Sequence, residues 1–141
     1  MFKISTRGQY ALLIMTELAE QKDNKFIPLK ILSKRHNLSV KYLEQILVQL
    51  SKAGLVTGVR GSNGGYKLLK EAKDYTAGEI LRALEGDLSP IAESDNNVLS
   101  NIGTDDFWKD FTKTINNFVD SVKLEDLVEK NKNHCGEMYY I

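Results

Sequence analysis

Cysteine is nearly absent from this 141-residue chain, which holds only Cys135. A single thiol cannot close an internal disulfide, which agrees with a reducing compartment, and it cannot supply a metal site built from several cysteines. The chain also lacks an apolar run of about 18 residues, so no segment is predicted to cross a membrane. Its first residues do not have the layout of a signal peptide. We therefore expect a cytoplasmic protein that holds no metal or other cofactor.

The chain also has no formal net charge, because 19 Lys and Arg residues balance 19 Asp and Glu residues. The balance hides an asymmetry between the two halves of the chain. Residues 1–73 carry 13 basic and 5 acidic side chains, whereas residues 74–141 carry 6 and 14. A basic half beside an acidic half favours a polyanionic partner for the first half, such as nucleic acid. The alternative is that both halves simply have solvated charged faces.

Three helices are predicted in the basic half. The first covers residues 5–21, where apolar residues recur at spacings of three and four. The second starts at Pro28 and runs to about Arg35, with Leu29, Ile31 and Leu32 as its buried side. Ser39 caps the third, which runs to about Ala53 and is followed by Gly54. The apolar stripe of the third helix comprises Leu43, Ile46, Leu47 and Leu50. This order is typical of a helix-turn-helix, and the alternative is an ordinary small helical bundle.

A β-hairpin is predicted directly after the third helix. The apolar, β-prone residues of 55–59 and 66–69 flank a tip that contains Gly61, Gly64 and Gly65. A hairpin in this place is a wing. Its Arg60 is suited to the negative minor groove of DNA, and Ser62 and Asn63 can donate hydrogen bonds to phosphate. A phosphate loop is disfavoured because no Lys-Ser or Lys-Thr closes the glycines. A tight hairpin that contacts nothing remains the plain alternative.

The acidic half is expected to begin with a short helix, residues 77–85, opened by a capping box at Thr76. Residues 87–103 are expected to be a loop. Thr104 is expected to cap a long helix that ends near Val122, and a last short helix covers residues 123–130. The long helix carries a wide apolar face: Phe107, Trp108, Phe111, Ile115, Phe118 and Val122. Such a face favours a homodimer, although the helix could also pack only within its own chain.

Catalytic chemistry is not indicated. No nucleophile, base and orienting acid occur together in the sequence, so we expect no enzyme. Cys135 follows His134 in a polar stretch. An inert thiol and a redox-sensitive thiol are both compatible with this pattern.

Four stretches, KISTRGQYAL, LSVKYLEQIL, GLVTGVRGSNGGYKL and TAGEILRALEG, resemble the Rrf-two family of bacterial transcriptional regulators. The similarity runs through residues 2–86 and continues more loosely along the long helix. It implies a mainly α fold with a small β-hairpin wing. Residues 1–86 would form a winged helix-turn-helix domain, residues 87–103 a loop, and residues 104–141 a dimerisation helix and tail. It also implies a repressor that binds a palindromic operator as a homodimer.

The resemblance further implies which residues contact DNA. The third helix would lie in the major groove and the wing would reach the minor groove, while the start of the first helix would touch the DNA backbone. The residues concerned are Thr6, Arg7, Ser39, Lys41, Tyr42, Glu44, Gln45, Arg60, Ser62 and Asn63. Glutamine can pair with adenine and glutamate can accept from cytosine, so these residue types suit base recognition.

The pattern departs from the family in one respect. Members that bind an iron–sulfur cluster carry three cysteines in the loop before the long helix, and residues 87–103 contain none. The resemblance is therefore to the cluster-free, cysteine-metabolism branch. In that branch the implied partner is cysteine synthase, and the terminal Tyr140 and Ile141 are candidates for insertion into it. Two other functions stay open: a protein-interaction module that docks on a biosynthetic enzyme, and a small-molecule sensor.

Overall fold

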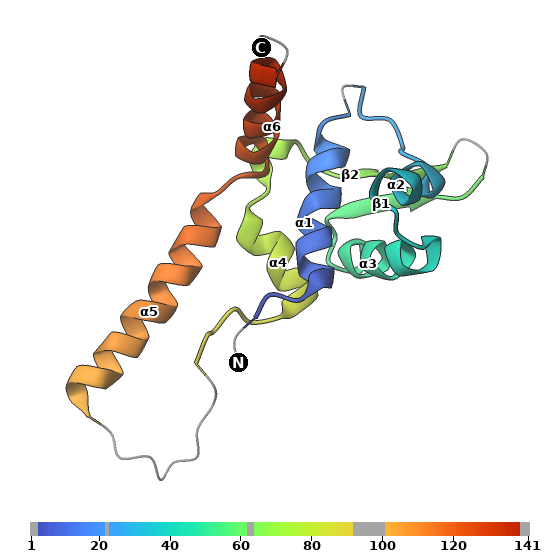
Figure 1. Cartoon of the computed structure of the whole chain (residues 1–141). Coiled ribbons are helices and arrows are strands. Elements are labelled where there is room, and N and C mark those ends of the chain that lie inside the picture. The colour runs from blue at the N-terminus through green and yellow to red at the C-terminus, as the bar shows by residue number, and fades with distance from the viewer. Residues whose placement is uncertain (1–2, 22, 62–63, 92–100, 139–141) are drawn as a thin grey trace.

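The computed structural model describes residues 3–21, 23–61, 64–91 and 101–138. The helices are α1 (Thr6–Ala19), α2 (Leu29–His36), α3 (Val40–Lys52), α4 (Ala77–Glu85), α5 (Ile102–Ser121) and α6 (Leu124–Met138). A short 3-10 helix, η1 (Ala72–Asp74), precedes α4. The strands β1 (Val56–Val59) and β2 (Gly65–Leu68) form an antiparallel hairpin. The expected mainly α fold with a small hairpin wing is confirmed (Figure 1).

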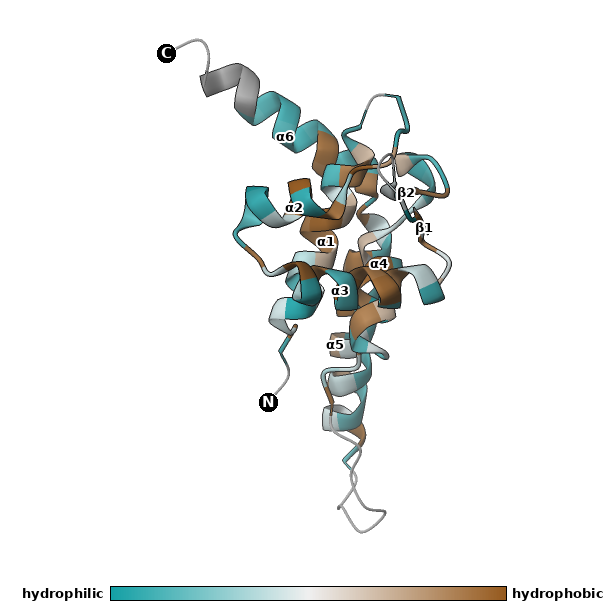
Figure 2. Ribbon diagram, turned by 90° about the vertical axis from the view of Figure 1, so that its right-hand side faces the viewer, coloured by the Kyte–Doolittle hydropathy of each residue, from teal (hydrophilic) through white to brown (hydrophobic). Residues whose placement is uncertain are grey.

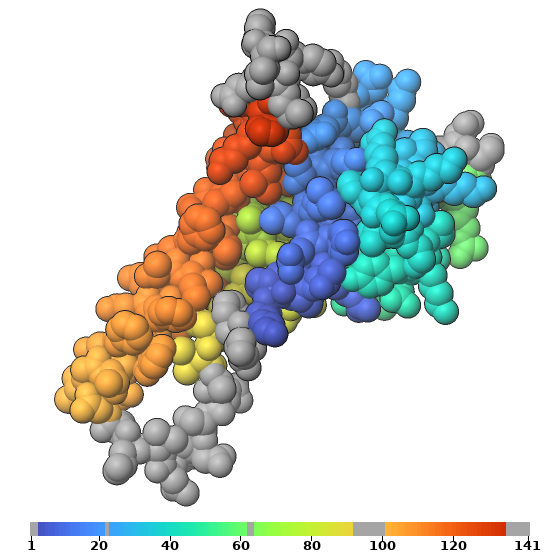
Figure 3. All heavy atoms as spheres, viewed as in Figure 1, coloured from blue at the N-terminus to red at the C-terminus, as the bar shows by residue number. Residues whose placement is uncertain are grey.

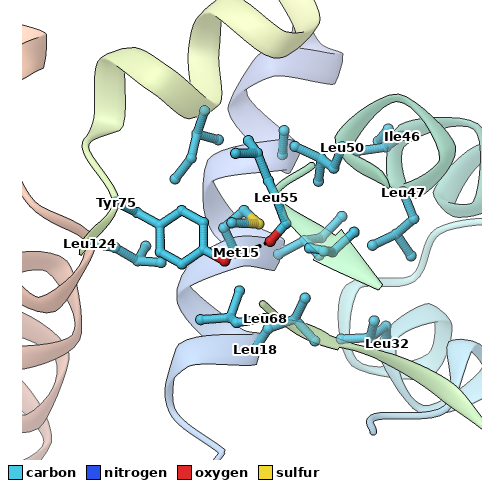
Figure 4. Close-up of a cluster of buried hydrophobic side chains, with 14 of the residues drawn as sticks. Met15, Leu18, Leu32, Ile46, Leu47, Leu50, Leu55, Leu68, Tyr75 and Leu124 are labelled. Carbon is cyan, nitrogen blue, oxygen red and sulfur yellow. Dashed lines mark hydrogen bonds between the residues drawn. The ribbon is translucent and has the colours of Figure 1, made fainter. Parts of the chain in front are cut away.

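One hydrophobic core joins α1, α3, the hairpin and α6 (Figure 4). The predicted stripe of α3 is fully buried in it, and Met15, Leu32 and Leu124 are equally enclosed. The prediction of the buried side of α2 was wrong for two residues, because Ile31 is 41% exposed and Leu29 is only partly buried. An eight-residue helix makes little more than two turns, so only Leu32 points fully inward.

The turn between α2 and α3 forms as expected. Asn37 ends α2 with a φ of +52°, a left-handed conformation that asparagine tolerates well. The Ser39 side chain accepts a hydrogen bond from the Tyr42 backbone N–H at 3.1 Å, which confirms Ser39 as the cap of α3. Gly54 follows α3 with a φ of +77°, as a helix-stopping glycine does. Together these local signals set where α2 ends and where α3 begins and ends.

The wing is anchored at its base by residues far away in the sequence. Val56 pairs with Leu68 and Val59 with Gly65, and a further bridge joins Ile27 to Tyr66. A methyl group on Gly65 would overlap the Ile27 carbonyl, and one on Gly64 would overlap the Val59 carbonyl. These two glycines are therefore required by close approach within the chain itself.

The acidic half differs from its prediction at two helix ends. Asn101, and not Thr104, caps α5: the Asn101 side chain accepts from the Thr104 backbone N–H at 3.2 Å. Helix α6 extends to Met138, so the polar stretch after residue 130 continues the helix instead of ending it. Helix α5 runs along α4 and extends past the rest of the domain (Figures 1 and 3). Thr76 caps α4 as predicted, with a 3.1 Å bond from the Glu79 N–H.

Candidate nucleic-acid interface

The first turns of α3 present a polar face to solvent. Lys41, Glu44 and Gln45 are exposed, and they lie opposite the buried stripe of the same helix. Tyr42 is only half-buried, because its ring packs edge-on against Tyr10 of α1 with the centroids 6.1 Å apart. Figure 2 shows the same division, with hydrophilic residues on the outer side of α3. The face combines hydrogen-bond donors and acceptors, as reading of base edges requires.

The wing, α3 and the start of α2 line a hollow of about 620 Å³ that is open to solvent. Glu44 lines it from α3, Arg60 from the position just after β1, and Lys30 from the start of α2. The structure thus brings together two predicted site residues, Glu44 and Arg60, that are 16 positions apart in the sequence. Lys52, at the end of α3, lines the same hollow. Three cations against one carboxylate give this surface the charge that suits a phosphate backbone.

Lys30 and Lys52 are site residues that the sequence did not predict. Lys52 lies eight residues after Glu44, on the same outer side of α3, so helical periodicity alone carries a signal for it. Lys30 carries no such signal, because only the packing of α2 beside the wing brings it near α3.

The start of α1 lies against α3. Thr6 is exposed, as a DNA contact would require. Arg7, also predicted to touch the DNA backbone, is half-buried and donates hydrogen bonds to two side chains of α3. Its Nη1 lies 3.2 Å from Gln49 Oε1, and its Nη2 lies 3.4 Å from Gln45 Oε1. Arg7 therefore joins α1 to the helix expected to read DNA.

Several predicted residues lie outside the described part of the chain. They are Ser62 and Asn63 at the wing tip and the tail residues Tyr140 and Ile141. The same holds for residues 92–100 of the loop. Their predicted roles stay predictions.

A second surface lies on α5, where four aromatic side chains are largely exposed. Phe107, Trp108, Phe111 and Phe118 have exposed fractions of 55%, 46%, 41% and 66%. The Phe107 and Trp108 centroids are 4.8 Å apart, and Trp108 and Phe111 are 5.9 Å apart. Ile115 and Val122, from the same predicted face, are half-buried. An apolar face of this kind is unusual on an isolated chain in water.

Helix α5 is attached to α4 by an ion pair. Arg82 Nη1 lies 2.6 Å from Asp120 Oδ1, Nη2 lies 3.0 Å from Oδ2, and Nη2 also donates to Asn116 at 2.7 Å. The hydrogen bond from Arg82 lowers the pKa of the Asp120 carboxyl below its ordinary value. Gly78 permits this approach, since a methyl group there would overlap the Asp120 carboxylate.

Within the described residues, no group of three or more His, Cys, Asp and Glu side chains is arranged to hold a metal ion. None of the helices in that part of the chain is both long and apolar enough to span a bilayer. The described residues offer two candidate surfaces, the α3 and wing face and the aromatic face of α5.

Known proteins resemble this chain over most of its length. A family model, Rrf2, described as an iron-dependent transcriptional regulator, matches residues 4–130. The HTH-type transcriptional regulator CymR of Bacillus subtilis (strain 168) is 40% identical over 125 residues, which cover 89% of this chain and 88% of the relative. The HTH-type transcriptional regulator IscR of Vibrio atlanticus (strain LGP32) is 32% identical, with 92% and 77% covered.

Solved structures agree with these relatives. The structure of CymR (YrzC), the global cysteine regulator of B. subtilis, matches with a TM-score of 0.82 at 39% identity, covering 92% of this chain and 98% of that one. The structure of T. potens IscR matches with a TM-score of 0.73 at 37% identity, covering 92% and 88%. These relatives are regulators of transcription and not enzymes, which supports the expectation that the chain is no enzyme and disfavours the interaction-module alternative.

Proposed function

Because the chain belongs to the Rrf2 family of DNA-binding transcriptional regulators, we propose that it is a homodimeric repressor that binds an operator of two half-sites in the cytoplasm. In each half-site, the N-terminal turns of α3 enter the major groove and the wing lies along the adjacent backbone with Arg60 in the minor groove. The observation that carries this proposal is the hollow between α3 and the wing, which gathers Arg60, Lys30, Lys52 and Glu44 on one face.

The proposed contacts follow from the exposure and chemistry of the side chains. Lys41 and Gln45 are exposed near the start of α3, where a recognition helix contacts base edges. Ser39 and Thr6 are exposed at the N-termini of α3 and α1, where backbone N–H groups also favour phosphate. Tyr42 is partly covered by Tyr10, so only part of its ring is available to DNA.

The aromatic face of α5 supports the homodimer. Pairing two copies of this face would remove Phe107, Trp108 and Phe118 from water, and aromatic residues are enriched at such interfaces. A closed two-fold pair is the commonest arrangement for identical chains. The two α3 helices of such a dimer would contact half-sites about one helical turn, or a small multiple, apart.

The family description implies iron, but the donor set of this chain does not fit a thiolate-held cluster. Such clusters are bound by several cysteines, and the sequence contains one. We therefore infer a regulator without an iron–sulfur cluster. The similarity to CymR, a cysteine regulator by name, supports a role in cysteine metabolism. Cysteine synthase as a partner stays a prediction, which is tested by deleting Tyr140 and Ile141 and measuring affinity for that enzyme; unchanged affinity contradicts tail insertion.

Selection of bound duplexes from random DNA tests the proposed function. We expect enrichment of an inverted repeat by the wild-type protein, and an affinity for it that falls steeply with salt, because lysines and arginines displace counterions. A protein that enriches no sequence, with and without cysteine synthase present, would overturn the proposal.

A further inference from the structure

Arg7 makes an unusual contact for a residue expected to touch the DNA backbone. Its guanidinium bridges Gln45 and Gln49, which are four residues apart and therefore on the same side of α3. The bond to Gln49 is partly buried and measures 3.2 Å; the bond to Gln45 is exposed and measures 3.4 Å. Gln49 thus anchors the guanidinium, and the anchored guanidinium reaches the exposed Gln45.

The chemistry of this bridge determines how the Gln45 amide is oriented. Arginine offers only donors, so the atom that faces it must be the amide oxygen. The Gln45 NH₂ group is then directed away from Arg7, and neither of its N–H donors bonds to another described residue. A glutamine without such a partner can rotate its amide by half a turn and exchange donor for acceptor. Donor and acceptor patterns distinguish the base pairs in the major groove, so this orientation matters for base recognition.

The position of Arg7 is itself well determined. Ser5 caps α1 by accepting from the Gly8 N–H at 3.1 Å. The Ser5 backbone N–H donates to Glu85 of α4 at 3.0 Å, and its hydroxyl donates to the same carboxylate. Gly8 is buried, and a methyl group there would overlap the Glu85 carboxylate. The first turn of α1 is therefore held against α4, and the edge-on packing of Tyr10 on Tyr42 holds it against α3.

We propose that Arg7 is a positioning residue for base recognition: it orients the Gln45 amide and so determines which base edge Gln45 reads. This inference rests on the proposed function and goes beyond it, because it replaces the expected backbone contact of Arg7 with a role in specificity. N–H donors directed away from Arg7 favour a base edge that presents acceptors, as guanine does with O6 and N7.

The experiment compares discrimination with affinity. The probes are the duplex that the wild-type protein selects from random DNA and copies of it with one base pair substituted. Gln45→Ala identifies the base pair that Gln45 reads: substituting that base pair weakens binding of the wild-type protein but not of the variant. For the wild-type protein that penalty is expected to be about 5- to 150-fold in affinity.

Two Arg7 variants separate positioning from charge. Arg7→Lys keeps the positive charge but loses the planar fork that binds two amide oxygens. We expect Arg7→Lys and Arg7→Ala, like Gln45→Ala, to bind the selected duplex and the duplex substituted at that base pair with nearly equal affinity. The salt dependence of binding should be the same for Arg7→Lys as for the wild-type protein. Gln49→Met removes the anchor and leaves Arg7 in place, and it is expected to reduce the same discrimination between duplexes. It replaces the Arg7 variants in the test if those variants fold poorly.

A different outcome would overturn the inference. If Arg7→Lys discriminates like the wild-type protein, and Arg7→Ala weakens binding to all duplexes equally with a salt slope smaller by about 0.9, Arg7 is a phosphate contact. If Gln45→Ala changes no base preference, there is no base reading for Arg7 to orient. These results leave the proposed function intact, whereas a wild-type protein that selects no duplex overturns both.

Discussion

Replacing Tyr75 with phenylalanine tests how the wing is held to the core. Tyr75 is fully buried, and its hydroxyl donates to the Leu55 carbonyl at 2.7 Å. The same hydroxyl accepts from the backbone N–H groups of Leu69 and Lys70, each at 3.0 Å. One oxygen atom therefore joins the residue before β1 to the residues after β2.

The expected cost follows from these three bonds. Each hydrogen bond contributes about 0.5–1.5 kcal/mol net, and a buried carbonyl left without a donor costs about 1–3 kcal/mol. Leu55 is buried, so its carbonyl takes the larger penalty, whereas Leu69 and Lys70 are exposed and their N–H groups regain water. We expect Tyr75→Phe to lower the free energy of unfolding by about 2–4 kcal/mol.

Denaturant unfolding at a fixed protein concentration measures this loss, because a dimer's stability depends on concentration. At about 3 °C per kcal/mol for a chain of this size, the melting temperature should fall by about 6–12 °C. The control is Tyr10→Phe, which removes a hydroxyl that has no hydrogen bond to any described residue. If Tyr75→Phe is no more destabilised than this control, the account of the wing base is wrong.

Three further predictions concern function and assembly. Arg60→Ala should weaken binding to the selected duplex by about 1–3 kcal/mol at physiological salt, measured by fluorescence anisotropy, whereas Lys130→Ala on α6 should not; equal effects would contradict a wing contact. Phe118→Asp should shift the protein from dimer to monomer in sedimentation, since it places a charge on the aromatic face of α5; a persistent dimer would place the interface elsewhere. The pKa of Asp120 is lowered by Arg82, so their ion pair stabilises above about pH 4 and is lost as the pH falls through the lower, folded-state pKa. Asp120→Asn should reduce the loss of unfolding free energy at acid pH by less than about 1 kcal/mol, because the pair is partly exposed. If the unfolding free energy of this variant falls at acid pH as much as that of the wild-type protein, the ion pair does not stabilise the fold.

Local signals were enough to predict most of the winged domain. Ser39 as a cap, Gly54 as a stop and the buried stripe of α3 depend on neighbours within a few residues, and the structure confirms them. The ends of α5 and α6 were less predictable. Asn101 and Thr104 both suit a cap, and only the backbone geometry decides between them. The polar sequence after residue 130 carries no apolar periodicity, although it continues α6.

The candidate site was predictable only in part, because it depends on tertiary contacts between residues that are far apart in the sequence. The polar face of α3 and the exposed Arg60 follow from periodicity and turn chemistry. The contact of Arg7 with Gln45 and Gln49 joins positions 38 and 42 residues apart, which no local pattern reports. The requirement for glycine at position 65 likewise comes from the Ile27 carbonyl, on a distant part of the chain.

Hydrogen exchange with and without the selected duplex tests the central claim, that α3 and the wing bind DNA together. The account predicts that backbone amides at the start of α3 and around Arg60 gain protection on DNA binding, and that those of α6 do not. Protection confined to α5 and α6, with the amides of α3 and the wing unchanged, would contradict it.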